Sequence, residues 1–344
     1  MKELSKRLRN LFALCARADC ALILLTVLLS VLLMLRFGVP GAGGSPAIEN
    51  VVSSEPAVSE PAQLDPLPPA GPPLRFMMYN VHNYFVPGEK SRSRYVNRAK
   101  SVKARNAVAD VIAEVAPEVV GLIEIGGEKA LEDLCERLRE RGLEYPYTYV
   151  LERRGEDRAL ALLSVHPIVS NDSVADVGLF GSQKRKMLRG ILDVTIGLED
   201  GRRFRIVGAH LKSRVGTDAA AADSLRRREA RTLAMYLHEQ QQRTPHVPVL
   251  VYGDWNDGPG DASLSVLVRG VGLRSGLTRL NPQDSQGNCW TLYFEDGREY
   301  FTFDQVFVNS VLKQRMGRRP KCGIADSSAT ATASDHRPVW CELR

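Results

Sequence analysis

The sequence predicts an α/β (α+β) fold built on mixed β-sheets, and three observations support that prediction. From Leu74 onward, apolar runs typical of strands alternate with amphipathic runs typical of helices. The pair Asp200-Gly201 separates two strand-like runs and is a strong hairpin signal, so antiparallel pairs occur beside helical crossovers. With 344 residues, of which 44% are hydrophobic, the chain can bury a sizeable core. Mixed sheets are therefore expected, and a uniformly parallel sheet is not.

Three segments of distinct composition precede the globular part. Residues 1–19 form a basic leader, and residues 20–39 are almost entirely apolar. Basic residues before an apolar run predict a cytoplasmic N-terminus and a transmembrane signal anchor; a cleaved secretory signal peptide is the alternative. Residues 40–73 are rich in Pro, Ala, Gly and Ser without Lys or Arg, which predicts a disordered linker. On either reading residues 74–344 form an exported domain, on the periplasmic or extracellular side, either membrane-anchored or secreted.

The helices and strands of the globular part are predicted from the periodicity of apolar residues and from the Gly and Pro residues that end each run. Helices are expected over Ala99–Val115, Glu128–Arg141 and Ser224–Gln242. Strands are expected over Leu74–Asn80, Val119–Ile125, Tyr147–Glu152, Ala159–Ser164, Ile191–Ile196, Arg203–His210, a run from Val249, Phe301–Asn309 and Pro338–Glu342.

Charge and cysteine content narrow the function classes only mildly. The net charge of +6 is compatible with a polyanionic substrate without requiring one. None of the six cysteines forms a CxxC pair, which argues against a zinc or redox site. Disulfides among Cys135, Cys289, Cys322 and Cys341 are compatible with export, but the spacing does not assign pairs.

The most informative stretch is residues 249–257, where an apolar strand ends at Gly253 and is followed by Asp254 and Asn256. Two polar residues at this spacing point to the same side of the strand exit. Such oxygen ligands suit a hard cation such as Mg²⁺ and the phosphate that it carries. An ordinary turn is the alternative.

Polar residues also mark two other strands near the start of the domain. Asn80 closes the strand 75–80 and can bind a phosphate oxygen or a metal-bound water, although a strand-end cap is the simpler interpretation. Glu124 lies in an otherwise apolar strand, where an unpaired carboxylate would be costly to bury. A cation is one partner for it; a position at the rim of the sheet is the alternative.

Histidines provide the remaining candidates. His210 ends a strand and precedes Lys212, so an imidazole and an ammonium group are available for a phosphate. Asp335 and His336 lie before the closing strand, and Asp304 lies within the strand 301–309. A carboxylate beside an imidazole fixes its tautomer and raises its pKa, as acid–base chemistry requires.

Taken together, these motifs resemble those of the endonuclease/exonuclease/phosphatase (DNase I-like) superfamily. The resemblance implies a four-layer α/β sandwich, in which two mixed β-sheets pack face to face with helices outside. It implies Glu124 and Asp335 as metal ligands, with Asn80 assisting, and Asp254 as the group that orients or deprotonates water. Asn256, Arg189, Lys212 and Asn80 would bind phosphate, while His210 and His336, the latter paired with Asp304, would complete the catalytic set.

The chain departs from the family pattern at three positions. His82 stands where many members carry an acidic residue, which puts a second metal in doubt. Ile125 follows the glutamate in place of a polar residue, and Gln305 follows Asp304 in place of His or Tyr.

The expected function is therefore Mg²⁺-dependent phosphodiester hydrolysis by an exported enzyme. Mn²⁺ is an alternative cofactor, and Ca²⁺ fits less well. A nuclease, in the manner of a DNA endonuclease, is the first expectation, with nucleic acid as substrate and the membrane as a partner of residues 20–39. A phospholipid, sphingomyelin or inositol-phosphate phosphoesterase is the alternative, and a non-catalytic binding module of the same fold is the third interpretation.

Overall fold

The structure, a computed structural model, describes residues 71–89, 99–182, 184–214, 218–272 and 276–344. All of them belong to one compact unit, Pro66–Arg344. The expected leader, the candidate anchor over residues 20–39 and most of the expected linker lie outside the described residues. Within the described ranges, every helix is too short or too polar to cross a bilayer.

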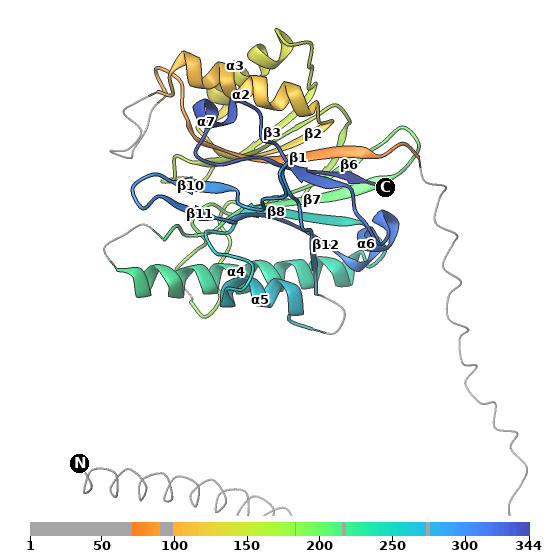
Figure 1. Cartoon of the computed structure of the whole chain (residues 1–344). Coiled ribbons are helices and arrows are strands. Elements are labelled where there is room, and N and C mark those ends of the chain that lie inside the picture. Colours follow the sequence, from red (N-terminus) through yellow and green to blue (C-terminus); the bar gives the residue numbers. More distant parts are fainter. Residues whose placement is uncertain (1–70, 90–98, 183, 215–217, 273–275) are drawn as a thin grey trace, which may run out of the picture. The chain divides into compact units, whose positions relative to one another are not determined.

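The first sheet contains six strands and includes both the first and the last strand of the unit (Figure 1). Its parallel pair is β1–β2, and its other neighbouring strands are antiparallel. The order is β13 (Cys322–Ile324), β14 (Val339–Leu343), β1 (Leu74–Tyr84), β2 (Val119–Ile125), β4 (Ala159–Ser164) and β3 (Tyr147–Leu151).

The second sheet also has six strands and again includes one parallel pair, β7–β8. The expected hairpin across Asp200-Gly201 is present as β6–β7. The order is β5 (Ile168–Asn171), β6 (Leu192–Gly197), β7 (Arg203–His210), β8 (Val249–Asp254), β12 (Asp304–Val308) and β9 (Thr278–Arg279). A separate small hairpin pairs β10 (Leu292–Phe294) with β11 (Glu299–Phe301).

Helices cover the outer face of each sheet, so the unit has four layers (Figure 1). The first sheet packs against α2 (Val102–Val115), α3 (Glu128–Arg139) and α7 (Thr330–Ala333). The second sheet packs against α4 (Ala219–Arg243) and α5 (Ala262–Arg269). A third apolar core lies between the sheets and receives Leu312 and Met316 of α6 (Ser310–Met316). The predicted fold class is confirmed.

One aromatic side chain sets how closely the two sheets approach. Tyr252 of β8 points across the central core, and its hydroxyl donates to the carbonyl oxygen of Ala161 on the opposite sheet at 3.4 Å. Glycines leave room for the ring on both sides: a Cβ on Gly121 would lie 2.4 Å from the ring, and one on Gly208 would lie 2.5 Å away.

Several short elements differ from the sequence-based expectation. The long helix α4 starts at Ala219, because the Asp218 side chain accepts a hydrogen bond from the amide of Ala221 and caps it. The strand expected over Phe301–Asn309 is divided into β11 and β12. The interruption has a local cause, since the Thr291 hydroxyl binds the amides of Phe303 and Asp304.

Candidate active site

The topology brings the polar strand ends to one edge of the two sheets. β1 and β2 are parallel, as are β7 and β8, so their carboxyl ends meet at that edge. Asp304 begins β12 directly opposite Asp254 of β8. Asn80 donates through its side-chain amide to Asp254 Oδ2 at 3.0 Å, which joins the first sheet to the second.

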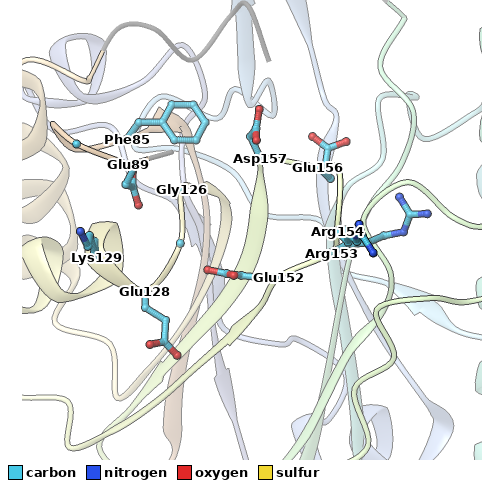
Figure 2. A pocket seen from close by; sticks show the side chains of 12 residues that line it. Phe85, Glu89, Gly126, Glu128, Lys129, Glu152, Arg153, Arg154, Glu156 and Asp157 are labelled. Atoms are coloured by element: carbon cyan, nitrogen blue, oxygen red, sulfur yellow. The ribbon is translucent and has the colours of Figure 1, made fainter. Parts of the chain in front are cut away.

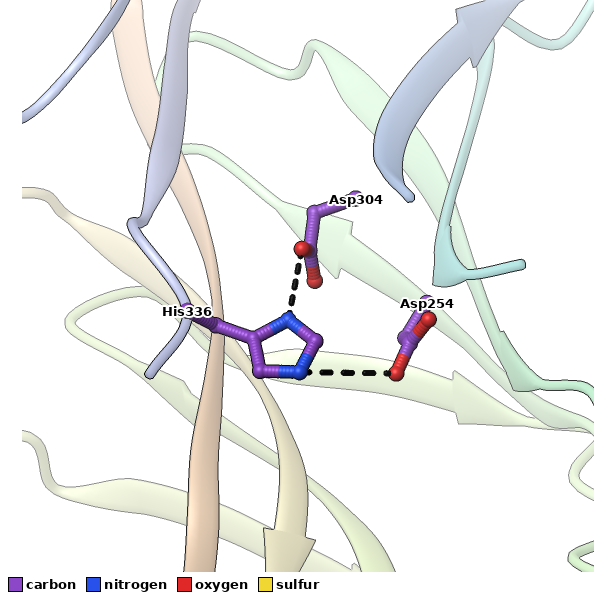
Figure 3. Close-up of side chains that lie close together, drawn as sticks. All are labelled: Asp254, Asp304 and His336. Carbon is purple, nitrogen blue, oxygen red and sulfur yellow. Dashed lines mark hydrogen bonds and ion pairs between the residues drawn. The ribbon is translucent and has the colours of Figure 1, made fainter. Parts of the chain in front are cut away.

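A buried histidine–aspartate pair faces Asp254 (Figure 3). His336 Nδ1 lies 2.7 Å from Asp304 Oδ2, and His336 Nε2 lies 3.9 Å from Asp254 Oδ2. Asp254 is held on its other oxygen by the Asn256 amide at 3.0 Å. The predicted Asp304–His336 pair therefore exists, and its free nitrogen points at the carboxylate predicted to orient water.

The pKa values of His336 and Asp254 are both raised, for different reasons. Burial by itself would lower the pKa of His336, but the Asp304 carboxylate, with Asp254 and Asp335, raises it well above the ordinary value. Burial raises the pKa of Asp254 to about 7; Asp304 adds to this rise, and His336 opposes it. His336 thus favours its protonated form more than an ordinary histidine does, and Asp254 holds its proton more tightly than an ordinary aspartic acid.

His210 lies on the other side of Asp254. Its Nε2 is 3.5 Å from Asp254 Oδ2 and 3.9 Å from Glu124 Oε1, and only 2% of the side chain is exposed. Burial, reinforced by the charges of Arg189 and Arg158, lowers its pKa well below the ordinary value. Its Nδ1 has no hydrogen-bond partner within the described ranges. A neutral imidazole at this position can donate one hydrogen bond to a bound oxyanion.

Glu124 is placed by a distortion in β2. The pairing register of β2 shifts at this residue on both sides, and its φ of 64° lies in the left-handed region. This bulge turns the carboxylate toward the site, where Oε2 accepts from the Asn83 amide at 3.1 Å. Arg158 approaches the same oxygen at 3.3 Å and donates to Asn83 Oδ1 at 2.7 Å.

Asp335 lies on the same side of the site as Glu124. Its Oδ1 lies 2.9 Å from His82 Nδ1, so the histidine that replaces the family's acidic residue binds a predicted metal ligand. Burial would raise the pKa of Asp335, but His82 and His336 lower it to about 2. Lys100 donates to the His82 carbonyl at 3.1 Å, and its ammonium is attracted by both Asp335 and Glu124. Those two carboxylates therefore share one neighbourhood.

The predicted phosphate-binding groups gather around the carbonyl oxygen of Leu211. Asn256 Nδ2 and Arg189 Nη1 each donate to it at 3.2 Å. Arg189 is 7% exposed, and its Nε lies 3.6 Å from Glu156 Oε2. Lys212 follows, with its ammonium donating to the carbonyl of Ser213 at 2.9 Å. Arg189 thus lies within the site, and Lys212 lies at its edge.

Two groups of donors are candidates for holding a divalent cation. One atom each from Asp254, Asp304 and His336 can be chosen so that all lie within 4.8 Å of one another. Within that set, however, the imidazole and Asp304 already satisfy each other. Glu124 and Asp335 are the better candidates for a hard cation, because both are carboxylates. Both also attract positive charge in this structure, since Arg158 lies beside Glu124, His82 lies beside Asp335, and Lys100 is attracted by both.

Several supporting residues carry no recognisable sequence signal. Thr291 fixes the start of β12 through the amide of Asp304 at 3.0 Å. The Ser334 hydroxyl donates to the Asn80 carbonyl at 2.8 Å and accepts from the His336 amide at 3.1 Å. Glu229 of α4 is fully buried and accepts from the amides of Leu188 and Lys212. Each acts through backbone groups, which sequence patterns do not report.

A hollow of about 720 Å³ is lined in part by Gly126 and Gly127, which follow the strand that carries Glu124 (Figure 2). It lies between the loops that follow β1, β2 and β3. Its charged lining is mainly acidic, with Glu89, Glu128, Glu152, Glu156 and Asp157 against Lys129, Arg153 and Arg154. Through the Glu156–Arg189 ion pair the hollow connects to the phosphate-binding groups.

Residues 80–281 match the family model described as the endonuclease/exonuclease/phosphatase family. The chain belongs to this family. Its members hydrolyse phosphoester bonds, and the matched region contains Asn80, Glu124, His210 and Asp254. No curated protein matches the chain in sequence.

Solved structures share the fold over about four-fifths of the chain. An endonuclease/exonuclease/phosphatase from Bacteroides vulgatus is 15% identical with a TM-score of 0.57, covering 80% of this chain and 99% of that one. The human nocturnin catalytic domain with bound sulfate is 17% identical, with a TM-score of 0.56 and coverages of 79% and 94%. Beta toxin from Staphylococcus aureus is 16% identical, with a TM-score of 0.56 and coverages of 78% and 99%. At these identities the likeness establishes the fold alone.

Proposed function

We propose that the protein is a divalent-metal-dependent phosphodiester hydrolase. Nucleic acid is the substrate class that we propose ahead of the alternatives. The observation that carries this proposal is the Asp304–His336 pair facing Asp254 across 3.9 Å, with buried Arg189 and Asn256 alongside. This arrangement combines a fixed carboxylate, an oriented imidazole and donors for an oxyanion, which together suit in-line attack of water on phosphorus.

Each side chain has a distinct task in this proposal. Asp254 is held on both oxygens, by Asn80 and by the Asn256 amide, so it can orient and accept a proton from the attacking water. His336 is held by Asp304 and directs Nε2 at a phosphoryl or leaving oxygen. Asn256, His210 and Arg189 donate to the non-bridging oxygens.

Glu124 and Asp335 would hold the cation, with Asn80 assisting through water. Mg²⁺ suits this oxygen donor set, and Mn²⁺ is the alternative. When bound, the cation supplies Lewis-acid stabilisation of the negative charge on phosphorus-bound oxygens.

The acidic hollow supports a second candidate, a phosphodiester that carries a cationic group, such as a choline-type phospholipid. Among the described residues that line the hollow, carboxylates outnumber basic groups, so these residues would attract an ammonium headgroup and repel a nucleic acid strand. Neutralising two of these acids, in Glu128→Gln/Glu152→Gln, separates the candidates. The KM should rise for a choline lipid and should fall or stay unchanged for DNA.

The deciding experiment offers the purified full-length chain plasmid DNA, RNA, sphingomyelin and an inositol phosphate, with Mg²⁺ or with EDTA. We expect plasmid cleavage that requires Mg²⁺ and falls on the order of 100-fold or more in Glu124→Gln. The matched control is Asp110→Asn, an exposed carboxylate on α2, which should cleave normally. EDTA-resistant cleavage would refute metal dependence. Absence of both cleavage and calorimetric Mg²⁺ binding would favour a binding module.

The site of action is part of the proposal. A basic leader followed by an apolar segment supports a catalytic domain held on the outer side of a membrane, by residues 20–39. Protease added to cells stripped of any outer membrane and wall, with the inner membrane still closed, should digest the catalytic domain if this is right. Protection of the domain until that membrane is lysed would contradict it, and recovery from the medium would indicate cleavage of the anchor.

A further inference from the structure

The strand pair β13–β14 places two cysteines directly opposite each other. In its antiparallel register Cys322 pairs with Cys341. The amide of Glu342 donates to the Lys321 carbonyl, and the amide of Ala325 donates to the Pro338 carbonyl. Hydrogen-bonded pairs alternate with non-hydrogen-bonded pairs, so the cysteines occupy a non-hydrogen-bonded pair. At such pairs the Cα atoms lie about 4.5 Å apart and the side chains approach most closely.

Both thiols also lie on the same face of the sheet. Cys341 is fully buried in the core between the sheets, and the half-buried Cys322 packs against that core. A Cα separation of about 4.5 Å lies inside the range of about 4.4–6.8 Å that a disulfide spans. The other described cysteines are in different settings, Cys135 on α3 and the exposed Cys289 in the loop before β10.

We propose that Cys322 and Cys341 are the site of a cross-strand disulfide, formed when the domain meets an oxidising environment. A low-molecular-weight disulfide such as oxidised glutathione serves as the oxidant. One cysteine thiolate attacks it and releases one glutathione thiol, and the second cysteine then displaces the other. Two protein thiols become one disulfide, and one glutathione disulfide becomes two thiols.

The order of attack follows from exposure. Burial raises the pKa of both thiols, and that of Cys341 rises well above the ordinary value. Cys322 is the more accessible of the two, so it attacks the oxidant first, and Cys341 resolves the mixed disulfide. Formation in the folded protein should accelerate as the pH rises, since the thiolate is the nucleophile.

The disulfide closes a loop that carries part of the candidate active site. Between the two cysteines lie α7 and the segment with Ser334, Asp335 and His336. Ser334 already ties that segment to β1 through the Asn80 carbonyl. The covalent bond would fix both ends of this segment, at Cys322 of β13 and at Cys341 of β14. This inference does not depend on the proposed hydrolase activity.

The test treats the full-length chain with oxidised glutathione, alkylates the remaining thiols and maps the peptides by mass spectrometry. Trypsin cleaves after Lys321 but not between Arg337 and Pro338, so both cysteines fall in one peptide, residues 322–344. We expect that peptide to escape alkylation and to weigh two hydrogens less. A protease that cleaves before Asp326 and Asp335 should cut this peptide into three fragments, and the two outer ones, 322–325 and 335–344, should separate only after reduction.

Thermal unfolding provides a second readout that does not depend on peptide recovery. Oxidation should raise Tm by roughly 5–10 °C, the gain expected for a bond that closes a loop of this length. Cys322→Ser should abolish the shift, and Cys289→Ser should retain it. Alkylation of Cys322 and Cys341 after oxidation, or a bond from either one to another cysteine, would overturn the proposal.

Discussion

Asp304 shows how much of the candidate chemistry depends on a single carboxylate. One oxygen binds His336 at 2.7 Å, and the other is buried without a hydrogen-bond partner among the described residues. An unpaired buried oxygen is costly, so the charge of Asp304 is balanced mainly by the imidazole. The pair behaves as one unit, in which the carboxylate fixes the ring and keeps it cationic.

Replacing this carboxylate by its isosteric amide should separate chemistry from binding. In Asp304→Asn the ring loses its negative partner, and kcat should fall on the order of 10²–10⁴-fold with little change in KM. Steady-state kinetics on whichever substrate of the proposed panel is cleaved measures both constants, with Asp110→Asn as the matched control. An unchanged kcat would exclude His336 from proton transfer.

At the scale of elements, the two sheets are held at a spacing that one ring defines. Tyr252 lies between Gly121 of the first sheet and Gly208 of its own sheet. A Cβ added to Gly121 would lie 2.4 Å from the ring, and one added to Gly208 would lie 2.5 Å from it. Because both sides are occupied by backbone, the ring cannot shift to accommodate a larger residue.

A single methyl group at this position should therefore destabilise the fold. Gly121→Ala should lower the free energy of unfolding by about 1–3 kcal/mol, as over-packing of a tight core does. Denaturant unfolding of the full chain measures it, and Gly260→Ala, which meets no atom within 4 Å, is the control. Equal midpoints for the two variants would show that the sheets can separate without cost.

A charged cluster joins α2 and α3 to β1 and makes stability depend on pH. Asp133 accepts from Tyr84 at 2.7 Å and from Arg137 at 2.8 Å, and Arg105 also binds it. Burial would raise the pKa of Asp133, but Arg137, Tyr84 and Arg105 together lower it. The cluster therefore stabilises the folded state most when Asp133 is ionised.

The sign of this effect follows from linkage. A carboxyl group whose pKa is depressed by folding contributes stability above its unfolded pKa of about 4, and that contribution is lost as the pH falls through the folded pKa. Asp133→Asn should flatten the decline in unfolding free energy below about pH 4. Urea titrations at several pH values provide the measurement. An unchanged slope in the variant would show that other carboxylates account for the acid sensitivity.

At the scale of the whole molecule, the site is a junction between two sheets. Asn80 binds Asp254, His336 binds Asp304, and Glu124 approaches His210, each pair crossing from one sheet to the other. Glu124 and Asp335 both act on Lys100 and so lie near each other at this edge, and a bound cation would relieve the repulsion between them.

Binding of Mg²⁺ should therefore stabilise the folded chain. At a concentration about a hundred-fold above its Kd, the rise in Tm should be roughly 5–10 °C. Differential scanning calorimetry with Mg²⁺ and with EDTA checks this, and Asp110→Asn should keep the shift. Glu124→Gln should lose it, and a full shift in that variant would assign the cation to other ligands.

Mixed sheets and most strand-end residues could be predicted from the residues themselves, because buried strands are apolar and polar residues at their ends stand out. The four-layer arrangement was predicted only from the resemblance to the family. Short elements such as β5, β9, β13 and α7 have too few residues to show the hydrophobic periodicity of a strand or a helix. The left-handed turn at Glu124, and the contacts of Arg158 and Lys100 with the site, depend on residues far apart in the chain. No local pattern encodes them.

The position of β14 inside the first sheet, between β13 and β1, has a consequence for biosynthesis. β14 pairs with β1, and the residues just before β14 supply Asp335 and His336. The pairing of β1 with β14 can therefore form only after almost the whole chain has been synthesised. A chain whose last residues are still inside the ribosome has neither side chain in place, so its candidate site is incomplete. The hydrolase activity proposed above would therefore appear only after the last residues have docked beside β1.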